Sequence, residues 1–173
     1  LQGRYADRLR VIDYAGSGIE TTFTQGEDSC LRNLVPHMPE ASGSAPSLLV
    51  VGTLSDVVED QFRAMFDAMG IERVDFLPPA RAGDLPPVGP ATRYLLAQPF
   101  LAETARLLEE RGARRLDAPM PIGEEGTTAW LQAAATAWGV ARDRFDRVTA
   151  PGRERVRKAL ARQRETLAGS RVF

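Results

Sequence analysis

The sequence has only one cysteine and one histidine among its 173 residues. A single cysteine forms no disulfide within the chain, which is typical of a reducing compartment. A zinc or iron–sulfur site needs several Cys or His ligands at close spacing, and Cys30 has only His37, seven residues on, as a neighbour of that kind. The sequence therefore predicts that this chain holds no complete metal centre unless carboxylates or another chain supply the remaining ligands.

Long apolar runs and nucleotide-binding motifs are also absent. No apolar stretch approaches the roughly 18 residues that a membrane helix needs. The stretch "GEEGTT" (123–128) lacks the lysine of a P-loop, and "GSG" (16–18) lacks the third glycine and the distant acidic residue of a dinucleotide-binding fingerprint. No signal or transit segment is recognisable, so we expect a cytoplasmic protein.

Charge is spread unevenly along a chain whose net charge is -1. From Ala141 onward there are ten Arg or Lys residues against four Asp or Glu residues. Such a segment is typical either of a solvated helix face with local ion pairs or of a surface that docks an acidic protein or nucleic acid. The sequence favours the solvated face, and we expect no nucleic-acid partner.

Apolar strands alternate with amphipathic helices through the middle of the chain. The continuous apolar run "SLLVVGTL" (47–54) predicts a strand buried on both faces, as in a parallel sheet. A helix should follow, with a capping box of Asp56 and Glu59, and should end at Gly70. Further strands are predicted at 73–77 and 93–100, and further helices from Leu101 to Gly112 and from Glu124 to Trp138. This alternation predicts a Rossmann-like α/β fold, doubly wound, with a mostly parallel sheet and helices on both faces.

The two ends of the chain are expected to belong to neighbouring domains. Residues 1–36, with a β-prone run at Val11, Ile12 and Tyr14, would end a first domain, and the Pro-, Gly- and Ser-rich residues 37–46 would form a linker. Residues 47–150 would form the Rossmann-like domain. Residues 151–173 would begin with Pro151 at the first position of a last helix and lead into another strand. We expect the chain to be a fragment, since it also lacks an initiator Met.

The polar stretch "GSGIETTFTQGEDSCL" (16–31) is the candidate site, because it follows a predicted strand and ligands in α/β proteins lie at the carboxyl ends of strands. Glu20, Glu27 and Asp28 could form an acid/base set. The sequence favours a turn acid and two acids that cap a helix running from about Gln25 to Val35. Cys30 would be a small buried apolar residue of that helix.

Four segments resemble the N-subunit family of light-independent (dark-operative) protochlorophyllide reductases, which are nitrogenase-like enzymes. They are this polar stretch, "LLVVGTLSDVVEDQF", "LAQPFLAETARLLEERGA" and "APMPIGEEGTTAWLQAAA". The resemblance covers nearly the whole chain but only the middle of such a subunit, whose overall form is the three-domain architecture of nitrogenase component 1.

The resemblance implies an enzyme of bacteriochlorophyll synthesis in photosynthetic organisms that reduces the C17–C18 double bond of protochlorophyllide. An ATP-binding L-subunit dimer, fed by ferredoxin, would pass electrons to an N2B2 heterotetramer. Three cysteines of the N subunit and an aspartate of the B subunit would hold a [4Fe-4S] cluster at the N–B interface. Those cysteines belong to a part of the subunit upstream of this chain, and Cys30 matches none of them.

The resemblance therefore implies no catalytic residue and no metal ligand in this chain. It places the polar stretch near the cluster or the N–B contact, without ligating iron. The residues expected there are Ser17, Gly18, Glu20, Thr22, Phe23, Thr24, Gln25, Gly26, Glu27 and Asp28. Alternatives are the related Y subunit of chlorophyllide reductase, a nitrogenase cofactor-assembly scaffold, and a Rossmann-like binding module without enzymatic activity.

Overall fold

A computed structural model describes residues 12, 22–81 and 83–169 of the chain. Of the β-prone run near the N-terminus only Ile12 is described, and Ser17, Gly18 and Glu20 lie outside the described residues, as does the strand expected after Gly169. The elements, in chain order, are α2 (Phe23–Leu34), the 3-10 helix η1 (Val35–His37), β1 (Ser47–Val51), α3 (Asp56–Met69), β2 (Val74–Leu77), β3 (Thr92–Leu96), α4 (Ala102–Glu110), β4 (Arg114–Arg115), α5 (Gly123–Ala137) and α6 (Arg142–Leu167).

The four strands form one parallel sheet in the order β2-β1-β3-β4. All five residues of β1 are buried, as its apolar run predicts. From β1 the chain moves through α3 to β2 on one side, and β3 then pairs with β1 on the other side. The carboxyl ends of β1 and β3 therefore flank the point where the strand order reverses, which is where ligands bind in open α/β sheets.

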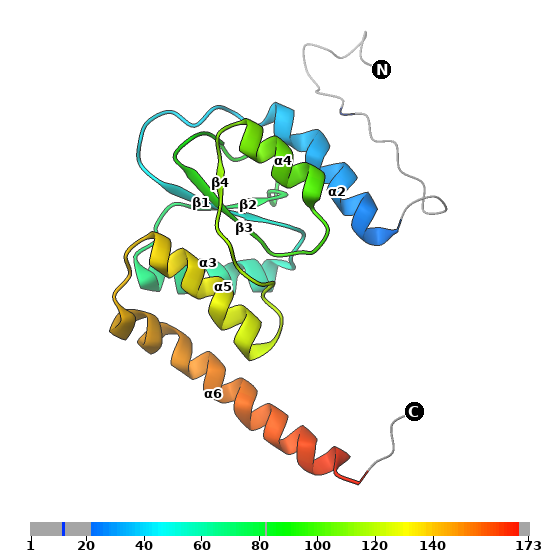
Figure 1. Cartoon of the computed structure of the whole chain (residues 1–173), viewed down its shortest axis with the longest axis vertical. Coiled ribbons are helices and arrows are strands. Elements are labelled where there is room, and N and C mark those ends of the chain that lie inside the picture. The colour runs from blue at the N-terminus through cyan, green and yellow to red at the C-terminus, as the bar shows by residue number, and fades with distance from the viewer. Residues whose placement is uncertain (1–11, 13–21, 82, 170–173) are drawn as a thin grey trace.

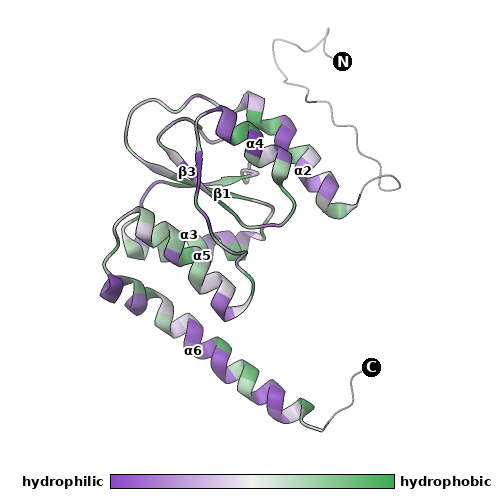
Figure 2. Ribbon diagram, viewed as in Figure 1, coloured by the Kyte–Doolittle hydropathy of each residue, from purple (hydrophilic) through white to green (hydrophobic). Residues whose placement is uncertain are grey.

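Helices cover both faces of the sheet, and α6 lies outermost (Figures 1 and 2). Because successive side chains of a strand point to opposite faces, β1 contributes to two separate apolar clusters. Leu48 and Val50 pack with residues of α3, α5 and α6, whereas Leu49 and Val51 pack with residues of α2 and α4. The predicted doubly wound α/β architecture is thereby confirmed.

Trp130 lies at the centre of the first cluster. Its side chain is fully buried, and its ring lies 4.8 Å from that of Phe62, centroid to centroid. The indole Nε1 donates a hydrogen bond of 2.8 Å to the carbonyl of Leu96, so the one polar atom of the side chain has a partner. Helix α5 is thus attached to the end of β3 by both apolar packing and a hydrogen bond.

The start of α3 differs from its predicted form. Helix α3 begins at Asp56 as expected, but Ser55 is its N-cap and makes no side-chain capping bond, so the predicted capping box is wrong. Asp56 and Glu59 instead lie in the first turn, where carboxylates favour the positive end of the helix dipole. A capping box does occur at α2, between Thr22 and Gln25.

Pro151 lies inside α6 and not at the first position of a helix, so that prediction is also wrong. Proline disfavours a helix interior because it lacks the backbone N–H and its ring crowds the preceding turn. Here tertiary packing outweighs that preference, because Phe145 and Thr149 are buried in the turns just before the proline. The helix therefore begins at Arg142 and continues through Pro151.

Candidate functional site

Glu27 connects α2 to the carboxyl end of β1. Its side chain is buried, and Oε1 accepts a hydrogen bond of 2.6 Å from the backbone N–H of Thr53, two residues after the strand. A charged acceptor makes such a bond shorter and stronger than one between neutral groups. Glu27 therefore fixes the β1–α3 loop, and it does not cap its own helix as the sequence suggested, since the first turn of α2 holds no acidic residue.

Asp28 caps the N-terminus of α4. Its two carboxylate oxygens accept hydrogen bonds from the backbone N–H groups of Glu103 at 3.0 Å and Thr104 at 2.9 Å. The hydroxyl of Thr104 donates to the same carboxylate at 2.6 Å. These are N–H groups of a first helical turn, which have no partner within their own helix. The prediction that Asp28 caps α2 is therefore wrong. Asp28 caps α4 instead, and it is separated from Glu103 by 75 positions in the sequence.

The loops after β1 and β3 are also joined to each other. The side-chain amide of Gln98 donates a hydrogen bond of 2.9 Å to the carbonyl of Thr53. Gly52 has a φ of +128°, and a Cβ there would lie 2.7 Å from Cγ of Gln98. Only glycine allows this close approach without displacing the Gln98 side chain. Glu27, Thr53 and Gln98 thus form a continuous hydrogen-bonded edge at the switch point of the sheet.

Large apolar side chains project from the same edge. Phe23, the first residue of α2, is 83% exposed, and Phe100, just before α4, is 73% exposed. Phe100 is also the one described non-glycine residue with a positive φ, at 64°. An exposed aromatic ring in a disfavoured backbone conformation is typical of a binding surface.

The other residues of the candidate stretch have structural roles. The hydroxyl of Thr22 accepts from the N–H of Gln25, and the side chain of Gln25 accepts from the N–H of Thr22. The N–H of Gly26 donates to the carbonyl of Thr22. Thr24 belongs to α2, and its side chain is outside the described set. The structure therefore brings Glu27 and Asp28 to the carboxyl edge, with Phe23 beside them, and uses Thr22 and Gln25 to begin the helix.

Cys30 lies on the exposed side of α2, so the prediction that it is a buried apolar residue is wrong. Helix α2 buries Leu31 in the adjacent apolar cluster, and η1 buries Val35 there, so the neighbouring position 30 faces away. Within the described part of the chain no three His, Cys, Asp or Glu side chains are grouped so that they could hold a metal ion. None of the described helices is both long enough and apolar enough to cross a membrane.

Comparison with known proteins decides the family. The profile of the "Nitrogenase component 1 type Oxidoreductase" family matches residues 2–173. The chain belongs to this family. It is 66% identical over 167 residues to a protein of Rhodospirillum rubrum named light-independent protochlorophyllide reductase subunit N, covering 96% of this chain and 38% of that protein. Proteins of the same name from Bradyrhizobium sp. ORS 278 and Rhodopseudomonas palustris BisB18 are 61% and 59% identical over all of this chain, which covers 41% and 40% of them.

The chain therefore spans about two fifths of the length of the curated relatives that it matches. Membership of the family confirms the resemblance stated from the sequence and the α/β fold class.

Sequence reasoning missed the partners of Glu27 and Asp28. Thr53, Gln98 and Thr104 lie in three different segments, and none forms a recognisable motif. One signal was available. Residues that directly follow buried parallel strands must meet at one edge of the sheet, so "GT" after β1 and "AQPF" after β3 could have been placed together.

Proposed function

We propose that this chain is a segment of the N subunit of light-independent protochlorophyllide reductase. The observation that carries the proposal is its identity of 56–66% with relatives of that name along 96–100% of its length. The family, whose members are oxidoreductases of nitrogenase component 1 type, supports the same assignment.

In the complete enzyme the subunit would act with partner subunits in the cytoplasm. A B subunit would complete an N2B2 heterotetramer, and an ATP-hydrolysing L-subunit dimer would deliver electrons from ferredoxin. The reaction would add two electrons and two protons across the C17–C18 double bond of protochlorophyllide and give chlorophyllide.

A [4Fe-4S] cluster in this enzyme would take its ligands from outside the described residues. Cys30 is the only cysteine of the chain, and among the described residues it belongs to no group of three or more His, Cys, Asp or Glu side chains that could hold a metal ion. The described residues therefore do not fit a cluster, and we assign none of them to electron transfer.

For the polar stretch we propose a supporting role at the carboxyl edge of the sheet. Glu27 and Asp28 already accept hydrogen bonds from backbone N–H groups, so their carboxylates are engaged in holding the β1–α3 loop and α4. Phe23 is free to contact a neighbour. The stretch that includes Ser17, Gly18 and Glu20 would thus shape the surroundings of the cluster or the N–B contact.

The test is an assay of the full-length subunit purified with its partner under anaerobic conditions. With reductant, ATP and the L subunit, we expect conversion of protochlorophyllide to a product that carries two more hydrogens, seen by absorption and mass spectrometry. Consumption of chlorophyllide in place of protochlorophyllide would identify the Y-subunit alternative. An intact cluster with no reduction of either pigment would point to the assembly scaffold.

A further inference from the structure

Strand β2 lies at one edge of the sheet. It pairs with β1 and with no other described strand. Alternate residues of a strand direct their peptide groups to opposite sides, so an edge strand has one row of N–H and C=O groups without a partner in the sheet. The carbonyls of Arg73 and Leu77 accept hydrogen bonds from backbone N–H groups of β1 and of the residue just after it. The peptide groups of Val74 and Phe76 therefore face outward.

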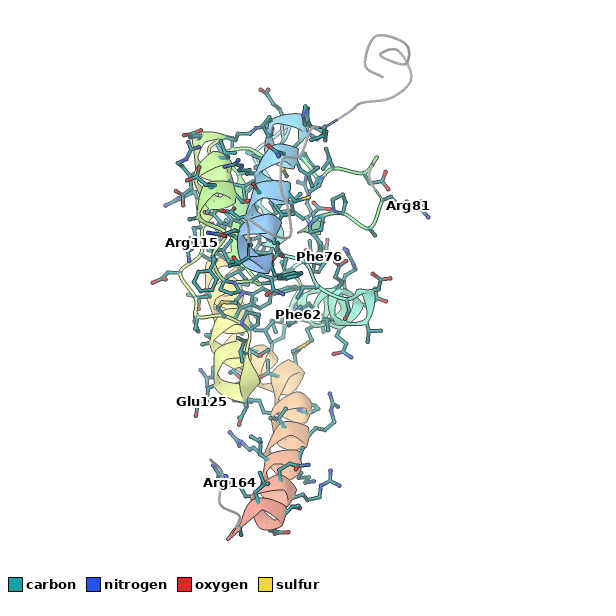
Figure 3. All side chains as sticks on the ribbon, turned by 90° about the vertical axis from the view of Figure 1, so that its right-hand side faces the viewer. Phe62, Phe76, Arg81, Arg115, Glu125 and Arg164 are labelled. Carbon is teal, nitrogen blue, oxygen red and sulfur yellow. The ribbon has the colours of Figure 1, made fainter. Side chains whose placement is uncertain are left out.

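The side chain of Arg63, in the middle of α3, covers this outer side. Its Nη1 donates a hydrogen bond of 2.7 Å to the carbonyl of Val74. Its guanidinium also lies over the ring of Phe76, with Cζ 4.8 Å from the ring centroid. Phe76 belongs to the same apolar cluster as Phe62 of α3 (Figure 3), so Arg63 extends from the helix to the outer side of the strand. A strand that added to this edge would have to displace Arg63 from the carbonyl.

A carboxylate lies on the other face of the same edge. Successive side chains of a strand alternate between its faces, so Asp75 points away from Val74 and Phe76. Asp75 is half-buried, and the positive charges of Arg63 and Arg73 act on it. Within one chain the two arginines thus offset part of the cost of burying this carboxylate. A second carboxylate brought opposite Asp75 would add a repulsion that has no such compensation.

A second copy of the chain would bring such a carboxylate. A closed pair of identical edges is related by a two-fold axis, which makes the two β2 strands antiparallel. Both outward-facing residues of each copy can bond only in the register that sets Val74 opposite Phe76 of the other copy. This register sets the two Asp75 residues opposite each other as a non-hydrogen-bonded pair, with Cα atoms about 4.5 Å apart. Like charges in this arrangement destabilise the pairing.

We propose that Arg63 and Asp75 together close the β2 edge against strand addition by a second copy of this chain. Arg63 occupies the outward-facing carbonyl of Val74, and Asp75 makes unfavourable the one register that uses all the outward-facing groups. Charged side chains at sheet edges are a general protection against edge-to-edge association. The protection does not depend on the reaction in which the subunit takes part.

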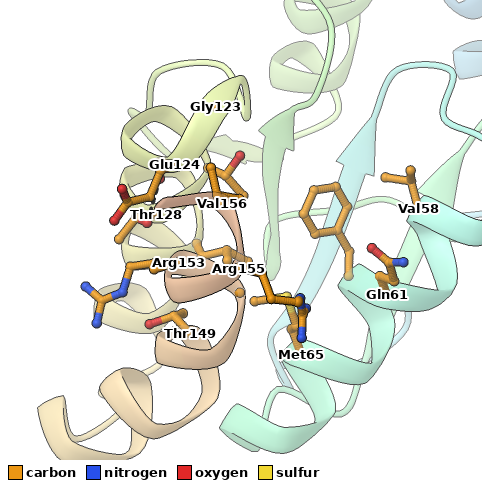
Figure 4. Close-up of a pocket in the computed structure, with 14 residues that line it drawn as sticks. Val58, Gln61, Met65, Gly123, Glu124, Thr128, Thr149, Arg153, Arg155 and Val156 are labelled. Atoms are coloured by element: carbon orange, nitrogen blue, oxygen red, sulfur yellow. Dashed lines mark hydrogen bonds between the residues drawn. The ribbon is translucent and has the colours of Figure 1, made fainter. Parts of the chain in front are cut away.

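The first test compares variants of the full-length subunit by sedimentation velocity. Arg63→Ala/Asp75→Asn should self-associate with a dissociation constant about tenfold or more below that of the unchanged subunit. Arg155→Ala is the matched control, because Arg155 is an exposed arginine of α6 that lines the groove between α3, α5 and α6 (Figure 4). This control should sediment like the unchanged subunit. Association of both variants to the same extent, or of neither, would overturn the proposal.

A cross-link then locates the contact and separates edge pairing from aggregation of unfolded chains. In Arg63→Ala/Asp75→Cys, a mild oxidant should join two copies through a disulfide between their positions 75, because the expected Cα separation lies within the range that a disulfide spans. Mass spectrometry of the digested dimer identifies the linked peptides. Asp75→Cys with Arg63 retained should give less of this product. Association without a link at position 75, or equal linking with and without Arg63, would contradict the closure of this edge.

Discussion

Two carboxylates of α2 hold segments that lie far from them in the sequence. Asp28 supplies acceptors for two N–H groups of α4 and for the hydroxyl of Thr104. Glu27 does the same for the loop that follows β1. At the residue scale, hydrogen bonds to backbone N–H groups give this pair of adjacent acids a structural role.

Replacing Asp28 with alanine should therefore destabilise the protein. Loss of an N-terminal cap costs about 1–2 kcal/mol, and the buried Thr104 hydroxyl also loses its best acceptor. Urea denaturation measures the change in the free energy of unfolding. Asp28→Asn, which keeps a side-chain oxygen, should recover part of the loss, and equal losses in the two variants would contradict the capping role.

Replacing Asp75 with asparagine should stabilise the protein near neutral pH. Burial raises the pKa of this carboxyl above its ordinary value of 3.8, although Arg63 and Arg73 act in the opposite direction. The folded state then binds its proton more readily than the unfolded state, so this group lowers stability as the pH rises from 3.8 through its pKa in the folded state. Urea denaturation at several pH values should show the advantage of the variant at about pH 7 and its decrease toward about pH 4.

Glycine is favourable at a helix end with a positive φ and unfavourable in a helix interior. Gly70 ends α3 with a φ of +85°, and its N–H donates to the carbonyls of Phe66 and Asp67. A Cβ at this position would lie 2.8 Å from Nη1 of Arg144, whose Nε donates to the carbonyl of Ala68. At the scale of the element, this glycine both terminates α3 and allows α6 to pack on its end.

Gly70→Ala should lower the free energy of unfolding by about 1 kcal/mol or more, because alanine disfavours a positive φ. Gly152→Ala is the matched change inside a helix. Apart from its chain neighbours and the backbone of its own helix, no atom lies within 4 Å of a Cβ there, and alanine in a helix interior stabilises by about 0.5–1 kcal/mol. Denaturation of the two variants should give shifts of opposite sign, and shifts of the same sign would exclude this explanation.

The regular elements were predictable because their signals are local. The apolar run of β1 and the apolar side of α3 predict those elements and their order. The start of α6 was not predictable from Pro151, because packing of Phe145 stabilises the helix before the proline. The arrangement of the candidate site was missed for a related reason, since Glu27 and Asp28 bond to residues 26 and 75 positions away.

At the scale of the whole molecule, the chain is a doubly wound domain whose carboxyl edge lacks a cover among the described residues. Large apolar side chains are exposed at this edge and on α6, and exposed apolar surfaces of this kind are typical of interaction sites. The polar bonds behind them keep the edge in a fixed shape.

Cys30→Ala in the full-length subunit should leave the iron content of the purified complex unchanged. The thiol is exposed on α2, and in the described structure it belongs to no group of three or more His, Cys, Asp or Glu side chains that could hold a metal ion. Iron analysis and visible absorption would measure the effect, with the Cys30→Ser variant as a second test of the same position. A loss of iron in both variants, with the complex still assembled, would contradict the prediction.

The capping of α4 by Asp28 also has an evolutionary consequence. The N-cap position of α4 is Leu101, an apolar residue that is buried in the second cluster and has no side-chain capping bond. A lineage that loses the acceptor at position 28 can replace it with Ser, Thr or Asn at position 101 only by removing a core side chain. Positions 28, 101 and 104 are therefore expected to change together or not at all among members of the family.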